Sequence, residues 1–167
     1  IIVMLATASV GAIFSSASPD FGVEGVLDRF GQIEPKIFVT TDGYNFNGKK
    51  ININEKVKKV LKSLKSVEET VLISLINSNE ININKKTIIY KDLLKEYESK
   101  ILEFEKLPLS HPLYIMFSSG TTGKPKCIVH SAGGVLLKHL VEVGLHSNAM
   151  ENKKIFYYTT CGWMMWN

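Results

Sequence analysis

Residues 113–126 have the sequence Leu-Tyr-Ile-Met-Phe-Ser-Ser-Gly-Thr-Thr-Gly-Lys-Pro-Lys, in which an apolar run gives way abruptly to a polar one. The five apolar residues at 113–117 predict a short strand that is buried on both faces, because no polar positions alternate with them. The polar stretch predicts a loop, since its glycines allow positive φ and let backbone approach a ligand closely. We therefore expect a buried strand that leads directly into a binding loop.

The loop is rich in groups that bind phosphate. Its hydroxyl and backbone N–H groups can donate hydrogen bonds to phosphate oxygens, and its lysines supply compact positive charge. Composition alone would also fit a surface loop with solvated lysines, but the order of the residues favours a polyphosphate site. The candidate binding residues are Ser118, Ser119, Gly120, Thr121, Thr122, Gly123, Lys124, Pro125 and Lys126.

This order resembles the ATP-binding signature of the adenylate-forming enzymes, a superfamily that includes acyl-CoA synthetases and luciferases. Every position of the family pattern [ST]-[SG]-G-[ST]-[ST]-G-x-P-K matches residues 118–126. The resemblance covers the whole chain and is strongest over residues 1–43 and 112–167. The ending Gly-Trp-Met-Met-Trp-Asn at 162–167 resembles the branch of acyl-CoA synthetases that acts on acetoacetate.

The resemblance implies a ligase that joins acetoacetate to coenzyme A and converts ATP into AMP and pyrophosphate through an acyl-adenylate. It implies ATP, Mg²⁺ and coenzyme A as cofactor and co-substrates. In this scheme Lys126 is the candidate group that stabilises the charge of the leaving pyrophosphate, while Lys124 occupies a variable position. Gly162 and Trp163 would line the acyl pocket, although a core tryptophan is the simpler alternative. His130 is expected to be a structural histidine with its hydrogen bonds satisfied.

Three other functions remain open. The chain could belong to a ligase for acetate, propionate or another short acid, or to a non-catalytic protein that kept the ATP loop. The third is a P-loop NTPase, because residues 43–50 nearly match the Walker A pattern. In that stretch, however, Lys50 stands where Ser or Thr should ligate Mg²⁺, so a hairpin or a surface loop is the expected structure.

Charge and composition argue against several protein classes. The net charge of +4 comes mostly from lysines in the 49–65 stretch, which we interpret as a solvated helix face. Aromatic residues do not interleave with these lysines, and no nucleic-acid-binding motif accompanies them. Residues 1–19 carry no charge but are too polar for a membrane span. The four histidines lack HExxH spacing, so we expect no structural metal.

The two cysteines, Cys127 and Cys161, do not form a CxxC pair or a disulfide framework. We expect both to be small core or pocket residues in a protein of the reducing cytosol. The sequence leaves the oligomeric state open.

The apolar pattern predicts an alternation of helices and strands. The predicted helices cover residues 1–10, 18–34, 54–66, 90–104 and 131–147, and the predicted strands cover 12–15, 36–41, 70–76, 113–117, 126–130 and 155–158. This alternation predicts an α/β fold with a mostly parallel sheet and flanking helices. The side chains predicted to pack inward are Val23, Val26, Leu27, Phe30, Val57, Val60, Leu61, Leu64, Leu136, Leu137, Leu140 and Val143.

Residues 1–167 are accordingly expected to be a fragment of the large N-terminal domain of an adenylate-forming enzyme, without a complete second domain. On its own, this fragment is not expected to form an acyl-adenylate.

Overall fold

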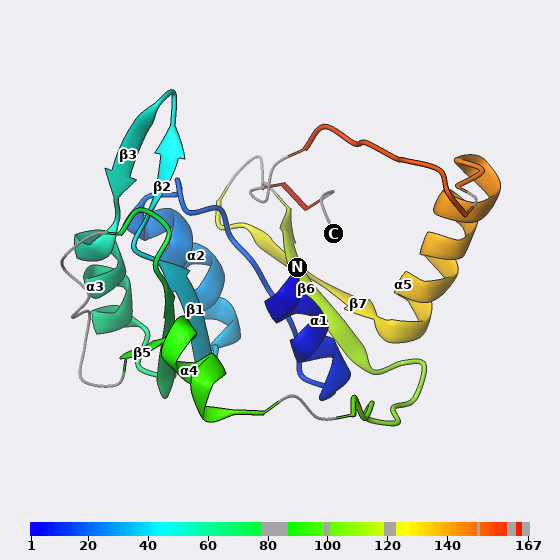
Figure 1. Ribbon diagram of the computed structural model, residues 1–167, viewed down its shortest axis with the longest axis horizontal. Coiled ribbons are helices and arrows are strands. Elements are labelled where there is room, and N and C mark those ends of the chain that lie inside the picture. The colour runs from blue at the N-terminus through cyan, green and yellow to red at the C-terminus, as the bar shows by residue number, and fades with distance from the viewer. Residues whose placement is uncertain (78–86, 99–100, 119–122, 150, 160–162, 165–167) are drawn as a thin grey trace. The chain divides into compact units, whose positions relative to one another are not determined.

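The computed structural model has an α/β fold and describes residues 1–77, 87–98, 101–118, 123–149, 151–159 and 163–164. The chain divides into two compact units, each of which is described by itself (Figure 1). One unit is continuous and comprises Ala17–Lys100. The other combines Ile1–Ser16 with Ile101–Asn167, so its two parts are distant in sequence.

The continuous unit contains the predicted parallel sheet. Its strands β1 (Ile37–Thr41), β4 (Glu69–Ile73) and β5 (Thr87–Ile89) lie in the order β1-β4-β5, and both neighbouring pairs are parallel. The sequence analysis did not predict strand β5, because it has only three residues and follows an asparagine-rich stretch. The helices of this unit are α2 (Val23–Ile33), α3 (Asn54–Ser63) and α4 (Tyr90–Glu96).

One apolar core lies between α2, α3 and the sheet. Its buried members are Val26, Phe38, Ile53, Val57, Val60, Leu64 and Leu72, and Val23, Leu27, Phe30 and Leu61 pack against them. The inward faces predicted for α2 and α3 are therefore confirmed. Helix α2 begins at Val23 rather than at Ser18, since Gly22 takes the extended N-cap conformation. It ends at Ile33, where Glu34 adopts a left-handed conformation with φ 47° before Pro35.

Residues 43–52 form a β-hairpin, as expected. Strands β2 (Gly43–Phe46) and β3 (Lys49–Asn52) are antiparallel, and Asn47 and Gly48 between them have φ of 46° and 73°. Two positive φ values in a two-residue Asn-Gly loop are the signature of a type I′ turn, which matches the twist of the strands. This hairpin contradicts the Walker A alternative, because a P-loop joins a strand to a helix.

Asp42, between β1 and β2, is completely buried. Its carboxylate accepts hydrogen bonds from the N–H groups of Leu75 (2.7 Å) and Ile76 (3.0 Å) and from the hydroxyl of Ser74 (3.1 Å). The Asp42 carboxylate is therefore a buried acceptor that joins the end of β1 to the segment after β4.

In the other unit, β6 (Pro112–Ser118) and β7 (Lys126–Ser131) form an antiparallel pair, which confirms both predicted strands. Helix α1 (Ile2–Ser9) ends before Gly11, whose φ is 71°. The strand predicted at 12–15 is reduced to one parallel bridge, in which the Phe14 N–H donates to the Leu113 carbonyl and the Ile115 N–H donates to the Phe14 carbonyl.

The chain after β7 is helical, as predicted, but is not packed as predicted. Helix α5 (Ala132–His139) continues into the π-helix η1 (Leu140–His146), and the Ser131 hydroxyl accepts the Gly134 N–H at 3.2 Å as the expected N-cap. The inward packing predicted for Leu136, Leu137, Leu140 and Val143 is wrong, since all four are exposed. The pattern correctly marked an apolar face, but no described part of this chain covers it.

Other predictions failed for related reasons. Helix α1 was expected to be buried, but none of its residues is, and most of them are half-buried. Helix α4 stops at Glu96 instead of 104, because Tyr97 is extended. Residues 155–158 are exposed and form no strand. Residues with high β-propensity form a strand only where a neighbouring strand can pair with them.

Among the described residues, no helix is long and apolar enough to cross a membrane.

Candidate functional site

The β6–β7 pair positions the predicted phosphate-binding loop. In its register Ser118 lies opposite Lys126, so the first and last residues of the nine-residue signature are direct neighbours across the strands. Ser118 is half-buried and Lys126 is exposed. Residues 119–122 lie outside the described residues, so the roles assigned to Ser119, Gly120, Thr121 and Thr122 stay predictions.

The exit of the loop is described from Gly123 onward. Gly123 has φ 135°, a conformation that L-residues rarely adopt. A Cβ added at this position would have no neighbouring atom within 4 Å. Lys124 is exposed, as expected for a variable position, and Pro125 is buried. The loop therefore ends on an anchored proline, with a lysine exposed on either side of it.

Strand β6 holds the loop from the other end. Tyr114, Met116 and Phe117 are all buried, and because they include adjacent positions, both faces of the strand are covered as predicted. The ring of Tyr114 packs edge-on against Phe14, with centroids 6.2 Å apart. Burial raises the pKa of the Tyr114 phenol above its ordinary value of 10.0, so this side chain is a neutral anchor.

His130 lies opposite Tyr114 on β7. Its Nε2 atom is buried and has no hydrogen-bond partner among the described residues, so the expectation of a fully satisfied histidine is wrong. Cys127 was expected in a core or pocket but is exposed; in the part of the chain that the structure describes, its strand β7 pairs with β6 alone. Cys161 lies outside the described residues.

Helix α5 begins at the end of β7, close to residue 109. The Gly133 N–H donates to the Leu109 carbonyl at 2.9 Å, and a Cβ on Gly133 would lie 2.9 Å from the Leu109 Cβ. Glycine is therefore required here for close approach of two backbone segments.

The proposed acyl-pocket residues are only partly described. Gly162 lies outside the described residues, and Trp163 is 54% exposed. Within the described residues, Trp163 therefore does not belong to a core. Its role in an acyl pocket stays a prediction.

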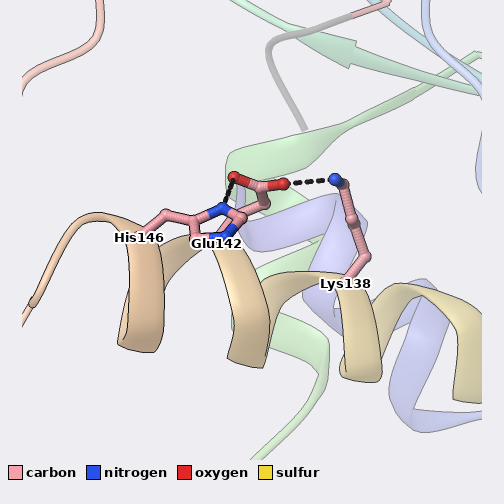
Figure 2. Close-up of polar contacts among 3 residues, drawn as sticks. All are labelled: Lys138, Glu142 and His146. Carbon is pink, nitrogen blue, oxygen red and sulfur yellow. Dashed lines mark hydrogen bonds and ion pairs between the residues drawn. The ribbon is translucent and has the colours of Figure 1, made fainter.

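A three-residue ionic ladder on α5 and η1 was missed in the sequence analysis (Figure 2). Glu142 accepts hydrogen bonds from Lys138 and from His146 Nδ1, the latter at 3.0 Å. These two hydrogen bonds lower the pKa of Glu142 from 4.5 to about 2. The sequence spacing could have predicted this ladder, because the three residues follow one another at i, i+4 and i+8 on a predicted helix.

No group of three potential metal-binding side chains occurs within the described ranges. Residues 118–126 also contain no carboxylate, so this loop is suited to anions rather than to direct chelation of Mg²⁺.

The chain belongs to the family of AMP-binding enzymes. The model of that family, described as AMP-binding enzyme, matches residues 1–165.

Within this family, the chain is similar over its whole length to acetoacetyl-CoA synthetases. It is 53% identical to that of Rhizobium meliloti (strain 1021), covering 100% of this chain and 26% of the relative, and 53% identical to that of Gallus gallus, covering 98% and 26%. A solved acetoacetyl-CoA synthetase from Streptomyces lividans matches with a TM-score of 0.90 at 38% identity, covering 99% of this chain and 25% of that one. The chain thus spans about a quarter of the length of these relatives.

Proposed function

We propose that this chain is the part of an acetoacetate–CoA ligase that binds the phosphates of ATP. The observation that supports this most directly is the complete signature at 118–126, carried by the β6–β7 pair of a chain from the AMP-binding family. The similarity to acetoacetyl-CoA synthetases, at 53% identity for two relatives, supports acetoacetate as the acid.

The proposed reaction has two steps. A carboxylate oxygen of acetoacetate attacks the α-phosphorus of ATP, and pyrophosphate leaves with the bonding electron pair to give acetoacetyl-AMP. The sulfur of coenzyme A then attacks the acyl carbon, loses its proton, and expels AMP. The protein has to align the reacting atoms and stabilise the negative charge that develops on pyrophosphate.

The loop residues suit the second requirement. Lys126 is exposed at the end of the loop, directly across from Ser118, where an ammonium group can contact a β- or γ-phosphate. Mg²⁺ would enter with ATP and be held chiefly by phosphate oxygens, consistent with a loop that has hydroxyls but no carboxylates. When bound, it would supply further neutralisation of the phosphate charge.

Other short acids are the main alternative to acetoacetate as the substrate. Trp163 would restrict the pocket to a short acyl chain, which also fits acetate or propionate. We favour acetoacetate because of the relatives named above. Acetoacetate activation would place the enzyme in lipid and ketone-body metabolism, and the two cysteines fit the reducing cytosol.

The test is a chimera in which these 167 residues replace the matched segment of the Rhizobium meliloti relative. ATP–pyrophosphate exchange by the chimera is measured with acetoacetate, acetate and propionate. We expect exchange with a strong preference for acetoacetate. Preference for another acid would contradict the substrate while keeping the ligase class. Absence of exchange with every acid, in a folded chimera whose parent is active, would favour a non-catalytic protein that retains the loop.

A further inference from the structure

Thr159 lies where the chain after η1 becomes buried again. Residues 151–158 form neither a helix nor a strand and are all exposed, whereas Thr159 is half-buried (Figure 1). Thr159 belongs to the compact unit that also contains β6, β7 and Trp163. Trp163, the described residue of the proposed acyl pocket, follows four positions later. Thr159 is therefore the last described residue before that pocket.

The hydroxyl group of Thr159 is buried and unpaired. Its Oγ1 atom is shielded from solvent and has no hydrogen-bond partner among the described residues. A hydroxyl can donate one hydrogen bond and accept two, so burying it without a partner destabilises the protein. An unpaired buried group of this kind requires an explanation, such as an acceptor that arrives with a ligand.

Thr70 shows why the position of Thr159 matters. Thr70, on β4, also has a buried Oγ1 atom without a hydrogen-bond partner in the described part of the chain, but the whole residue is only 1% exposed. Its hydroxyl is enclosed within the continuous unit, where a substrate cannot reach it. Thr159 instead ends an exposed segment and is itself partly exposed, so a small ligand can approach its hydroxyl.

The acid substrate supplies a suitable acceptor. Acetoacetate differs from butyrate, which is also a four-carbon acid, by the keto oxygen on its third carbon. This oxygen loses its hydrogen bonds to water when the acid enters a pocket, and a hydroxyl donor can replace them. A donor on the attacking carboxylate would lower its nucleophilicity, so the keto oxygen is the better acceptor. We infer that Thr159 Oγ1 donates a hydrogen bond to this keto oxygen and thereby determines specificity for 3-keto acids, an inference that rests on the proposed ligase function.

Thr159 and Trp163 would select different properties of the acid. A bulky aromatic side chain restricts the length of the acyl chain, but a hydrophobic pocket discriminates only weakly between acids that differ by one small group. A hydrogen bond within the pocket discriminates more strongly, because an acid without the keto oxygen leaves the hydroxyl unpaired. Thr159 would therefore supply selectivity that size alone does not give.

The test uses the chimera with the Rhizobium meliloti relative. Rates of ATP–pyrophosphate exchange give kcat/KM for acetoacetate and for butyrate, together with KM for ATP. We expect Thr159→Val to lower kcat/KM for acetoacetate about 10- to 100-fold, because the keto oxygen loses its donor in a desolvated site. The value for butyrate, which lacks the acceptor, should change less than about threefold. KM for ATP should stay the same, and Thr159→Ser, which keeps the hydroxyl, should retain the preference for acetoacetate.

Thermal stability separates a ligand contact from a structural role. Replacing an unpaired buried hydroxyl with a methyl group removes a polar group that has no partner in the protein. The ligand-free Thr159→Val chimera should therefore unfold at the same temperature as the parent chimera or at a higher one. Thr70→Val is the matched control, because it makes the same replacement at the other unpaired threonine. It should also keep the unfolding temperature, but it should leave the preference for acetoacetate unchanged.

Several outcomes would overturn the inference. A lower unfolding temperature or a loss of folding in Thr159→Val would mean that the hydroxyl has a partner in the protein itself. Equal losses with acetoacetate and butyrate, a higher KM for ATP, or no change with either acid would also contradict it. All of these results would leave the ligase function intact. Only the absence of exchange with every acid in the unmodified chimera would remove that function, and this inference with it.

Discussion

At the scale of single residues, the two lysines of the loop provide a matched pair. Both are exposed, but Lys126 lies across from Ser118, whereas Lys124 occupies the one variable position of the signature. In the chimera with the Rhizobium meliloti relative, we expect Lys126→Ala to lower pyrophosphate exchange about 10²- to 10³-fold through loss of charge stabilisation. Lys124→Ala should change the exchange rate less than threefold, because the charge of a solvated surface lysine contributes little interaction energy. Equal effects of the two changes on the initial exchange rate would contradict the assignment.

Asp42 provides a residue-scale prediction about stability. Replacing it with alanine would leave the buried N–H groups of Leu75 and Ile76 without their acceptor. We expect Asp42→Ala to reduce the free energy of unfolding by about 2–4 kcal/mol, as is typical when buried donors lose their partners. Asp42→Asn keeps one acceptor oxygen and should cost less. Urea denaturation measures both, with the exposed Asp92→Ala as control; a similarly small effect of all three changes would be incompatible with this role.

At the scale of secondary-structure elements, the ionic ladder makes α5 and η1 sensitive to acid. The pKa of Glu142 is lowered from 4.5 to about 2 by hydrogen bonds from Lys138 and His146. Because the folded-state pKa is the lower one, the ladder stabilises the helix above pH 4.5, and this contribution disappears as the pH falls toward 2. We expect the side-chain carboxyl carbon of Glu142 to titrate in NMR spectra with a midpoint near 2 while the chain remains folded.

The control is Lys138→Gln, which removes the hydrogen bond with the larger influence and should move the Glu142 midpoint up toward 4.5. A midpoint near 4.5 in the wild-type chain would show that the ladder is not formed in solution.

Sequence patterns predicted helix packing best in the continuous unit, Ala17–Lys100. The faces of α2 and α3 were predicted correctly because Val26, Val57 and Val60 pack against a sheet built from the same 84-residue segment, Ala17–Lys100. The face of α5 has equally clear spacing, yet Leu136 and Leu140 are exposed. Periodicity shows which side of a helix is suited to burial but not whether that side is covered.

At the scale of the whole molecule, the α/β class followed from the alternation of elements, and the candidate loop followed from an ordered nine-residue signature. The connection of β6 to β7 as an antiparallel pair was not predicted, because adjacent strands in sequence can pair in either direction. The buried Asp42 carboxylate was also missed, since its partners Leu75 and Ile76 are 33 and 34 residues away in the sequence and only the fold brings them together. The ladder was missed although its i, i+4 spacing is visible in the sequence. Most of the site prediction therefore came from residue order and little from periodicity.

The last prediction concerns the 167-residue chain by itself. Adenylate formation requires the acid and the α-phosphate of ATP to be aligned and shielded from water. The chain supplies the loop on β6 and β7, but Lys124, Lys126 and Trp163 are all exposed, and it spans only about a quarter of its acetoacetyl-CoA synthetase relatives. We expect the purified chain to show no acetoacetate-dependent ATP–pyrophosphate exchange, whereas the full-length Rhizobium meliloti relative, as control, should show it under the same conditions. Exchange that depends on acetoacetate and disappears with Lys126→Ala would instead mean that these residues suffice for the first chemical step.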